Sequence, residues 1–127
     1  MKTKLNIIIK LLLNIHKALL DLERANYEGK NGPISNNHEY FSLVVNHEDF
    51  KWLRKLSEII ALIDEESEQE VIDIKKVKEL LDNLKDLFAE NKNDEFSLRY
   101  NFALNSYKNI FDLNRELMAE IDSVLNN

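Results

Sequence analysis

The sequence predicts an all-α protein, an up-down-up-down antiparallel four-helix bundle that forms a single domain over residues 1–127. Both glycines and the only proline, Gly29, Gly32 and Pro33, fall within five residues, and these residue types usually mark turns and helix ends. Elsewhere the apolar residues recur at alternating steps of three and four, which is the spacing of one helix face. Segments of this kind with short connections favour antiparallel neighbours.

The first helix is predicted over about residues 3–27, and a loop follows over residues 29–37. The second helix covers about residues 38–66, with a potential break near Asn46. There, His47-Glu48-Asp49 after Asn46 is typical of an N-cap followed by an acidic first turn. Its second part places Trp52 on the apolar side, and we expect this indole to pack against the first or the last helix.

The third helix is predicted over about residues 73–90 with Asp73 as its N-cap, and the fourth over about residues 95–125 after a turn at residues 91–94. Ser106 follows Asn105 and marks a potential break within the fourth helix. The acidic run at residues 64–70 is predicted to be a solvated helix end or linker.

Composition limits the classes of function. The net charge is −6, with +2 in residues 1–63 and −8 in residues 64–127, so nucleic acid is not expected as a partner. The absence of cysteine excludes disulfides, thiolate catalysis and Cys-based metal sites. Lys10 and Asn14 interrupt the apolar N-terminal segment, so we expect no membrane span and a cytoplasmic location.

Two polar residues of the first helix, His16 and Glu23, fall on the centre of its apolar face. A buried carboxylate needs a partner, and antiparallel packing places Arg99 at the level of Glu23. We therefore expect a bidentate and largely buried Glu23–Arg99 pair. The same layering places His16 near Tyr107, with Asp49 or Trp52 across from it.

Two interpretations of these residues stay open. They are either core polar groups that fix the register of the helices, or they line a polar pocket between helices that binds a small ligand. The candidate pocket residues are His16, Glu23, Arg99, Tyr100 and Tyr107.

Metal and catalytic patterns are sparse. The Glu-x-x-His pairs of di-iron bundles are absent, and no metal ligand, cofactor or catalytic residue is assigned. One carboxylate pattern resembles that of the all-helical nucleotide pyrophosphohydrolases, which hold Mg²⁺ against a triphosphate. It is formed by Glu65, Glu68, Glu79 and Asp82, and Mg²⁺-dependent hydrolysis is the least favoured alternative function.

Longer segments resemble a group of small, uncharacterised all-helical bacterial proteins. The matching segments are residues 16–28, residues 50–57 with the Phe-x-Trp-Leu-Arg-x-Leu-Ser pattern, residues 63–65, and Arg99-Tyr100. In that group a proline often follows Trp-Leu-Arg, where this chain has Lys55. The resemblance implies the all-helical fold and no particular activity. It selects His16, Glu23, Trp52, Arg54, Asp64 and Arg99 as one set.

The leading prediction of function is an interaction module that acts through protein contacts, with an unknown partner protein or a second copy as a homodimer. The second helix presents a stripe that mixes an aromatic residue, an arginine and small residues, and this composition suits an interface. The stripe is formed by Phe50, Arg54, Ser57 and Ala61.

Overall fold

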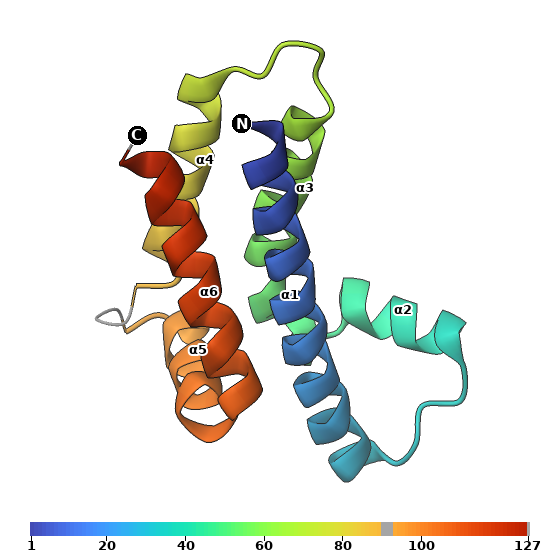
Figure 1. Ribbon diagram of the computed structural model, residues 1–127. Helices are drawn as coiled ribbons and strands as arrows, with labels where there is room; N and C mark the ends of the chain where they lie inside the picture. The colour runs from blue at the N-terminus through green and yellow to red at the C-terminus, as the bar shows by residue number, and fades with distance from the viewer. Residues whose placement is uncertain (90–92, 127) are drawn as a thin grey trace.

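A computed structural model describes residues 1–89 and 93–126, and these residues contain helices and no strand. The all-α prediction is confirmed, but the predicted number of four helices is wrong (Figure 1). The elements are α1 (Lys2–Asn31), α2 (Asn37–Asn46), the 3-10 helix η1 (Glu48–Leu53), α3 (Arg54–Ser67), α4 (Ile74–Leu87), α5 (Glu95–Ser106) and α6 (Lys108–Leu125).

The second predicted helix is divided into α2, η1 and α3. The potential break near Asn46 is confirmed, but the N-cap is His47 and not Asn46. The His47 backbone is extended, and its ring Nδ1 accepts the backbone N–H of Asp49 at 3.1 Å. The imidazole therefore takes the part that an Asn or Ser side chain usually takes at a helix start.

The fourth predicted helix is interrupted at Tyr107, one residue after Ser106. Tyr107 has an extended backbone (φ −130°, ψ 110°), which ends α5 and starts α6. At the other boundaries, Asp73 caps α4 as predicted, with its side chain accepting the Lys76 N–H. Helix α1 continues past its predicted end to Gly32, whose φ of +84° suits a glycine.

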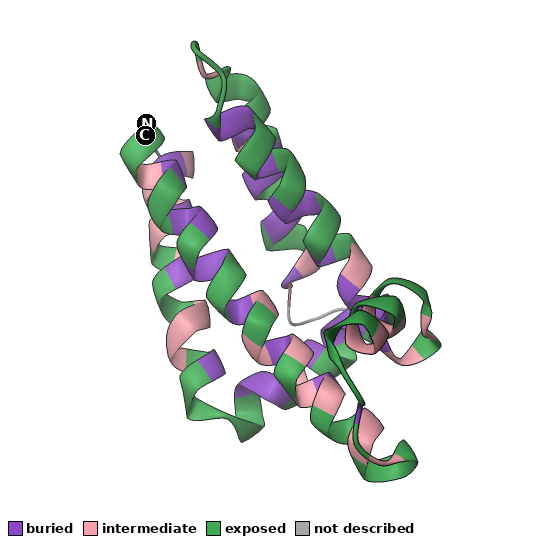
Figure 2. Cartoon of the chain, turned by 90° about the vertical axis from the view of Figure 1, so that its right-hand side faces the viewer, coloured by how far each residue is buried: buried purple, intermediate pink, exposed green. Residues whose placement is uncertain are grey.

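Four of the helices close a ring of pairwise contacts: α1 packs on α3 and α6, and α4 also packs on α3 and α6. The chain runs in alternating directions through α1, α3, α4 and α6, and both termini lie at the same end (Figure 1). The buried residues lie on the inward faces of these helices (Figure 2). At the opposite end, α5 packs on α6 and η1, while α2 projects from the side.

The acidic run at residues 64–70 is not solvated throughout, because Glu66 and Ser67 are buried. The Glu66 carboxylate accepts the Asp73 N–H at 3.1 Å and lies 3.4 Å from Lys76 Nζ. Glu66, near the end of α3, therefore holds the start of α4 in place, and the sequence does not reveal this contact. No helix in the described part of the chain has the length and apolar character needed to cross a membrane.

Helix α2 is held by few contacts and contains no buried residue. Its Tyr40 ring lies edge-on to Phe50 of η1, and the Arg24 guanidinium lies 4.5 Å from the centre of the Tyr40 ring.

We expect the backbone amides of α2 to exchange about 100-fold faster than those of residues 8–19 in α1, because sparse burial permits local opening. Hydrogen exchange followed by NMR measures this ratio, and equal protection of both segments would contradict it.

Candidate functional site

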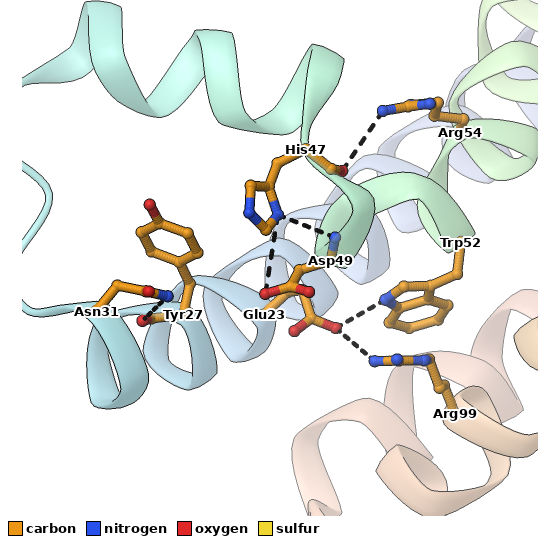
Figure 3. A network of polar contacts seen from close by, with 8 residues as sticks. All are labelled: Glu23, Tyr27, Asn31, His47, Asp49, Trp52, Arg54 and Arg99. Atoms are coloured by element: carbon orange, nitrogen blue, oxygen red, sulfur yellow. Dashed lines mark hydrogen bonds and ion pairs between the residues drawn. The ribbon is translucent and has the colours of Figure 1, made fainter.

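A buried carboxylate joins three elements at the end of the molecule where α5 lies. Glu23 of α1 is 5% exposed, and its Oε1 accepts hydrogen bonds from Trp52 Nε1 of η1 at 2.8 Å and from Arg99 Nη1 of α5 at 2.9 Å (Figure 3). We call these three residues the Glu23 cluster. Both donors meet at one oxygen, which satisfies a charge that would otherwise be costly to bury.

The predicted Glu23–Arg99 pair is confirmed as a contact, but two of its expected features are wrong. Only Arg99 Nη1 is found on Glu23, so the pair is not bidentate, and the Arg99 side chain is 44% exposed. Its Nε lies 3.5 Å from Glu95 Oε2 on the outer side. The guanidinium is exposed because it lies between a buried and an exposed carboxylate, and it passes 5.8 Å from the centre of the Trp52 ring.

The packing predicted for Trp52 is confirmed, because its ring is buried against Phe96 of α5 and its N–H reaches α1. Sequence reasoning does not identify this indole N–H as a partner of Glu23. The sequence does contain a signal for this contact: Trp52, which carries a donor, lies on the apolar side of one predicted helix, and the Glu23 carboxylate lies on the apolar side of another.

A cleft of about 230 Å³ opens beside the Glu23 cluster, and we call it the Trp52 cleft. Its rim is apolar and exposed: Leu98 is 60% exposed, Phe102 67% and Tyr107 40%. Leu98 and Phe102 are one turn apart on α5, so they lie on one side of that helix. The lining residues are Leu22, Glu23, Asn26, Trp52, Leu98, Arg99, Phe102, Ala103 and Tyr107.

Tyr100 does not belong to this cleft, although the sequence placed it in the candidate pocket. Its ring packs on Phe88 and Phe96, and its hydroxyl donates to Asn114 Oδ1 at 2.8 Å. Burial raises the pKa of the Tyr100 hydroxyl far above its usual value. Tyr100 therefore serves the core between α5 and α6, and it stays protonated.

His16 lies in a second, separate site, so the predicted pocket that combines His16 with Glu23 and Arg99 is wrong. His16 Nε2 lies 2.7 Å from Ser57 Oγ of α3. Two turns, about 10 Å, separate His16 from Glu23 along α1. Around His16, helix α1 packs against α3. Tyr107 lines the Trp52 cleft instead, and Asp49 lies beside His47, so His16 meets neither of them.

The predicted interface stripe is not a continuous surface. Phe50 is 1% exposed and packs among the rings of Tyr27 and Tyr40, beneath α2. Arg54 is half-buried, and its Nη2 donates to the His47 carbonyl at 3.5 Å. The remaining members, Ser57 and Ala61, are exposed and line the site at His16. The stripe is broken because the separate helix α2 covers its first residue.

The carboxylate pattern that resembles the nucleotide pyrophosphohydrolases does not assemble a metal site. Over residues 1–89 and 93–126, no three or more His, Asp or Glu side chains converge in a way that would hold a metal ion. The four carboxylates, Glu65, Glu68, Glu79 and Asp82, are all exposed. The geometry that this alternative function requires is therefore not met.

Comparison of the chain with protein-family models, with curated proteins and with solved structures finds no significant match. The resemblance to the group of small bacterial proteins stays a prediction. The residues it selects fall at different places, with Glu23, Trp52 and Arg99 in one cluster and His16 and Asp64 in another site.

The three-way contact predicts a specific pattern of stability changes. Arg99→Met should lower the free energy of unfolding by about 1–2 kcal/mol, since Trp52 still donates to Glu23. Glu23→Leu should cost more, about 2–4 kcal/mol, because it also leaves the Trp52 N–H without an acceptor. The double variant should not regain this loss, and after Glu23→Leu the Arg99→Met change should cost little.

Urea unfolding of the four species forms a double-mutant cycle that measures the coupling. Lys85→Met is the matched control, because Lys85 makes an exposed ion pair of 2.7 Å with Asp122, and such pairs contribute about 0–1 kcal/mol. Additive losses at positions 23 and 99 would contradict the coupling.

His16 predicts a pH dependence of stability. Burial lowers the pKa of His16 below the ordinary value of 6.5, so the unfolded chain binds a proton at a higher pH than the folded chain does. The stability that neutral His16 provides is present above pH 6.5 and is lost as the pH falls from there through the folded-state pKa. Urea melts from pH 8 to 5 should show a smaller decline in His16→Gln, and an unchanged decline would refute this role.

Proposed function

We propose that this protein is a helical interaction module whose Trp52 cleft binds an amphipathic helix of a partner protein. In this proposal α1, α3, α4 and α6 act as the four-helix bundle that holds the cleft in place. The proposal rests on one observation: Leu98, Phe102 and Tyr107 remain exposed around a cleft that is also lined by the hydrogen-bonded Glu23 cluster. Exposed apolar residues grouped around a depression are typical of binding surfaces.

The composition of the cleft supports a protein partner. Tyr and Arg are among the residues that most often dominate the binding energy of protein interfaces, and the exposed side chains of Tyr107 and Arg99 both line this cleft. The Arg99 guanidinium is already held between Glu23 and Glu95 before binding. A partner would therefore lose less conformational freedom on the side of this protein than it would on a flexible surface.

The walls of the cleft favour a helical partner. They are formed by α1, by η1 and by α5 with the following Tyr107, and backbone groups inside helices are already hydrogen-bonded to one another. An extended segment would find no backbone donors or acceptors to pair with. A helix brings its own backbone bonds and can insert a side chain from its apolar face.

The charges around Arg99 determine which side chain of the partner helix fits next to its apolar anchor residue. Arg99 has contacts to Glu23 and Glu95, so its charge is already balanced, but a guanidinium has five donors and further N–H groups remain. An uncharged acceptor such as an Asn or Gln side chain fits this position, since an added carboxylate would face two others.

The test selects binders from a displayed library of amphipathic helical peptides that vary the apolar anchor and its neighbour. Selected peptides should gain helical circular dichroism on binding. Phe102→Asp should weaken them at least about tenfold, as loss of an interface anchor does. Phe111→Asp is the matched control, because Phe111 is 49% exposed on α6 and does not line the cleft.

Equal effects of the Phe102 and Phe111 substitutions, or peptides that stay extended when bound, would contradict the proposal. Sedimentation of the protein without peptide tests whether a second copy of this chain occupies the cleft. A dimer at micromolar concentration that Phe102→Asp dissociates would assign the cleft to a second copy of this chain and overturn the proposed hetero-partner.

A further inference from the structure

A second depression, of about 260 Å³, lies between α1 and α3, and we call it the His16 groove. We propose that it binds a small elongated organic cation, with a primary ammonium at Asp64 and an uncharged hydrogen-bond donor at Ser57. This site is separate from the Trp52 cleft and does not depend on the function proposed for it. The lining residues are Ile9, Leu13, His16, Ser57, Ile60, Ala61 and Asp64.

The middle of the groove is apolar, and its ends are polar. Ile9, Leu13 and His16 follow one another along α1, while Ser57, Ala61 and Asp64 follow one another along α3. Because Ser57 faces His16 and Asp64 lies seven residues further, the two polar ends are about 10 Å apart along the helix. An unbranched aliphatic chain suits the apolar stretch between them.

The Ser57 end offers an acceptor. The Ser57 hydroxyl lies 2.7 Å from His16 Nε2 and 3.3 Å from the Leu53 carbonyl oxygen. Its single proton satisfies both contacts only when it is donated to Leu53 and His16 Nε2–H donates to Ser57 Oγ. A lone pair of Oγ then remains for a ligand donor.

The same arrangement argues for binding and against catalysis at Ser57. In this tautomer Nε2 carries the proton and donates to Ser57 Oγ, so it does not act as the general base that a nucleophilic serine needs. The neighbouring backbone N–H groups are engaged within α3, so they cannot stabilise an oxyanion. The His16–Ser57 pair therefore acts as a fixed polar end of the groove.

The Asp64 end offers a negative charge. Its carboxylate is exposed, and no ion pair or side-chain hydrogen bond to it is found within residues 1–89 and 93–126. An unpaired carboxylate attracts an ammonium and repels an anionic ligand. Together, an acceptor at one end and an anion at the other select a cation that has donors at both ends.

The probe is 6-amino-1-hexanol, compared with 1-hexanol, hexylamine and 6-hydroxyhexanoate. NMR titration of the whole chain should give a dissociation constant of about 1 mM for the amino alcohol, because so few atoms allow only a small total free energy of binding. The shifted amides should be those of the groove. Hexylamine and hexanol should bind more weakly, and 6-hydroxyhexanoate weakest of the four.

Asp64→Asn should weaken the amino alcohol about threefold to fivefold, in proportion to an exposed ion pair, and should leave hexanol unchanged. Glu58→Gln is its control, because Glu58 is exposed on α3 outside the groove. Ala61→Phe should fill the groove and reduce binding at least about tenfold, while Ala25→Phe on the exposed side of α1 should not.

Circular dichroism verifies that each variant folds. The titration of the wild-type chain with the four probes tests the proposal even if a variant does not fold. No binding at 10 mM probe, shifts away from the groove, or equal losses in Asp64→Asn and Glu58→Gln would overturn the proposal. The last result would assign the amine to general attraction by an acidic protein. Phe102→Asp should leave probe binding unchanged, which separates this test from that of the Trp52 cleft.

Discussion

The carboxylate of Glu23 constrains the arrangement of one whole end of this molecule. It is buried, and a single oxygen receives N–H groups from Trp52 and Arg99, which are 29 and 76 residues away in the sequence. If α1, η1 or α5 shifted, a charge would be left in an apolar surrounding with fewer partners. The three elements are therefore fixed relative to one another more strictly than apolar packing alone would require.

The two ends of the molecule are held by different physical means. Where the termini lie, α1, α3, α4 and α6 enclose an apolar core, and the connection from α3 to α4 is closed by buried Glu66. At the other end the helices are interrupted at His47 and Tyr107, and aromatic rings and the Glu23 cluster complete the packing. The Trp52 cleft lies at this second end, where the interruptions leave apolar residues of α5 exposed.

The sequence predicted the parts of the structure that depend on one continuous helix. The apolar face of α1 placed Glu23 inside, and the cost of an unpaired charge pointed to Arg99. The prediction that His16 lies near Tyr107 was wrong, because it assigned residues to levels along unbroken helices. The breaks turn α3 and α5 toward different sides of α1. Phe50 was misplaced for the same reason, since a helical wheel of residues 38–66 cannot show that α2 folds back over η1. The indole donor of Trp52 was missed because η1 is a 3-10 helix, whose side-chain directions differ from those of an α-helix.

The Trp52 N–H that donates to Glu23 belongs to the single tryptophan of the chain, so its indole gives one unambiguous NMR signal. The most direct measurement is the hydrogen-exchange rate of this indole N–H in the wild-type protein and in Glu23→Gln and Glu23→Leu. We expect slow exchange in the wild type, comparable with core amides, a moderate increase of the rate in Glu23→Gln and a large increase in Glu23→Leu. If the indole N–H of the wild type exchanges as fast as that of free tryptophan, the hydrogen bond to Glu23 does not hold this end of the molecule.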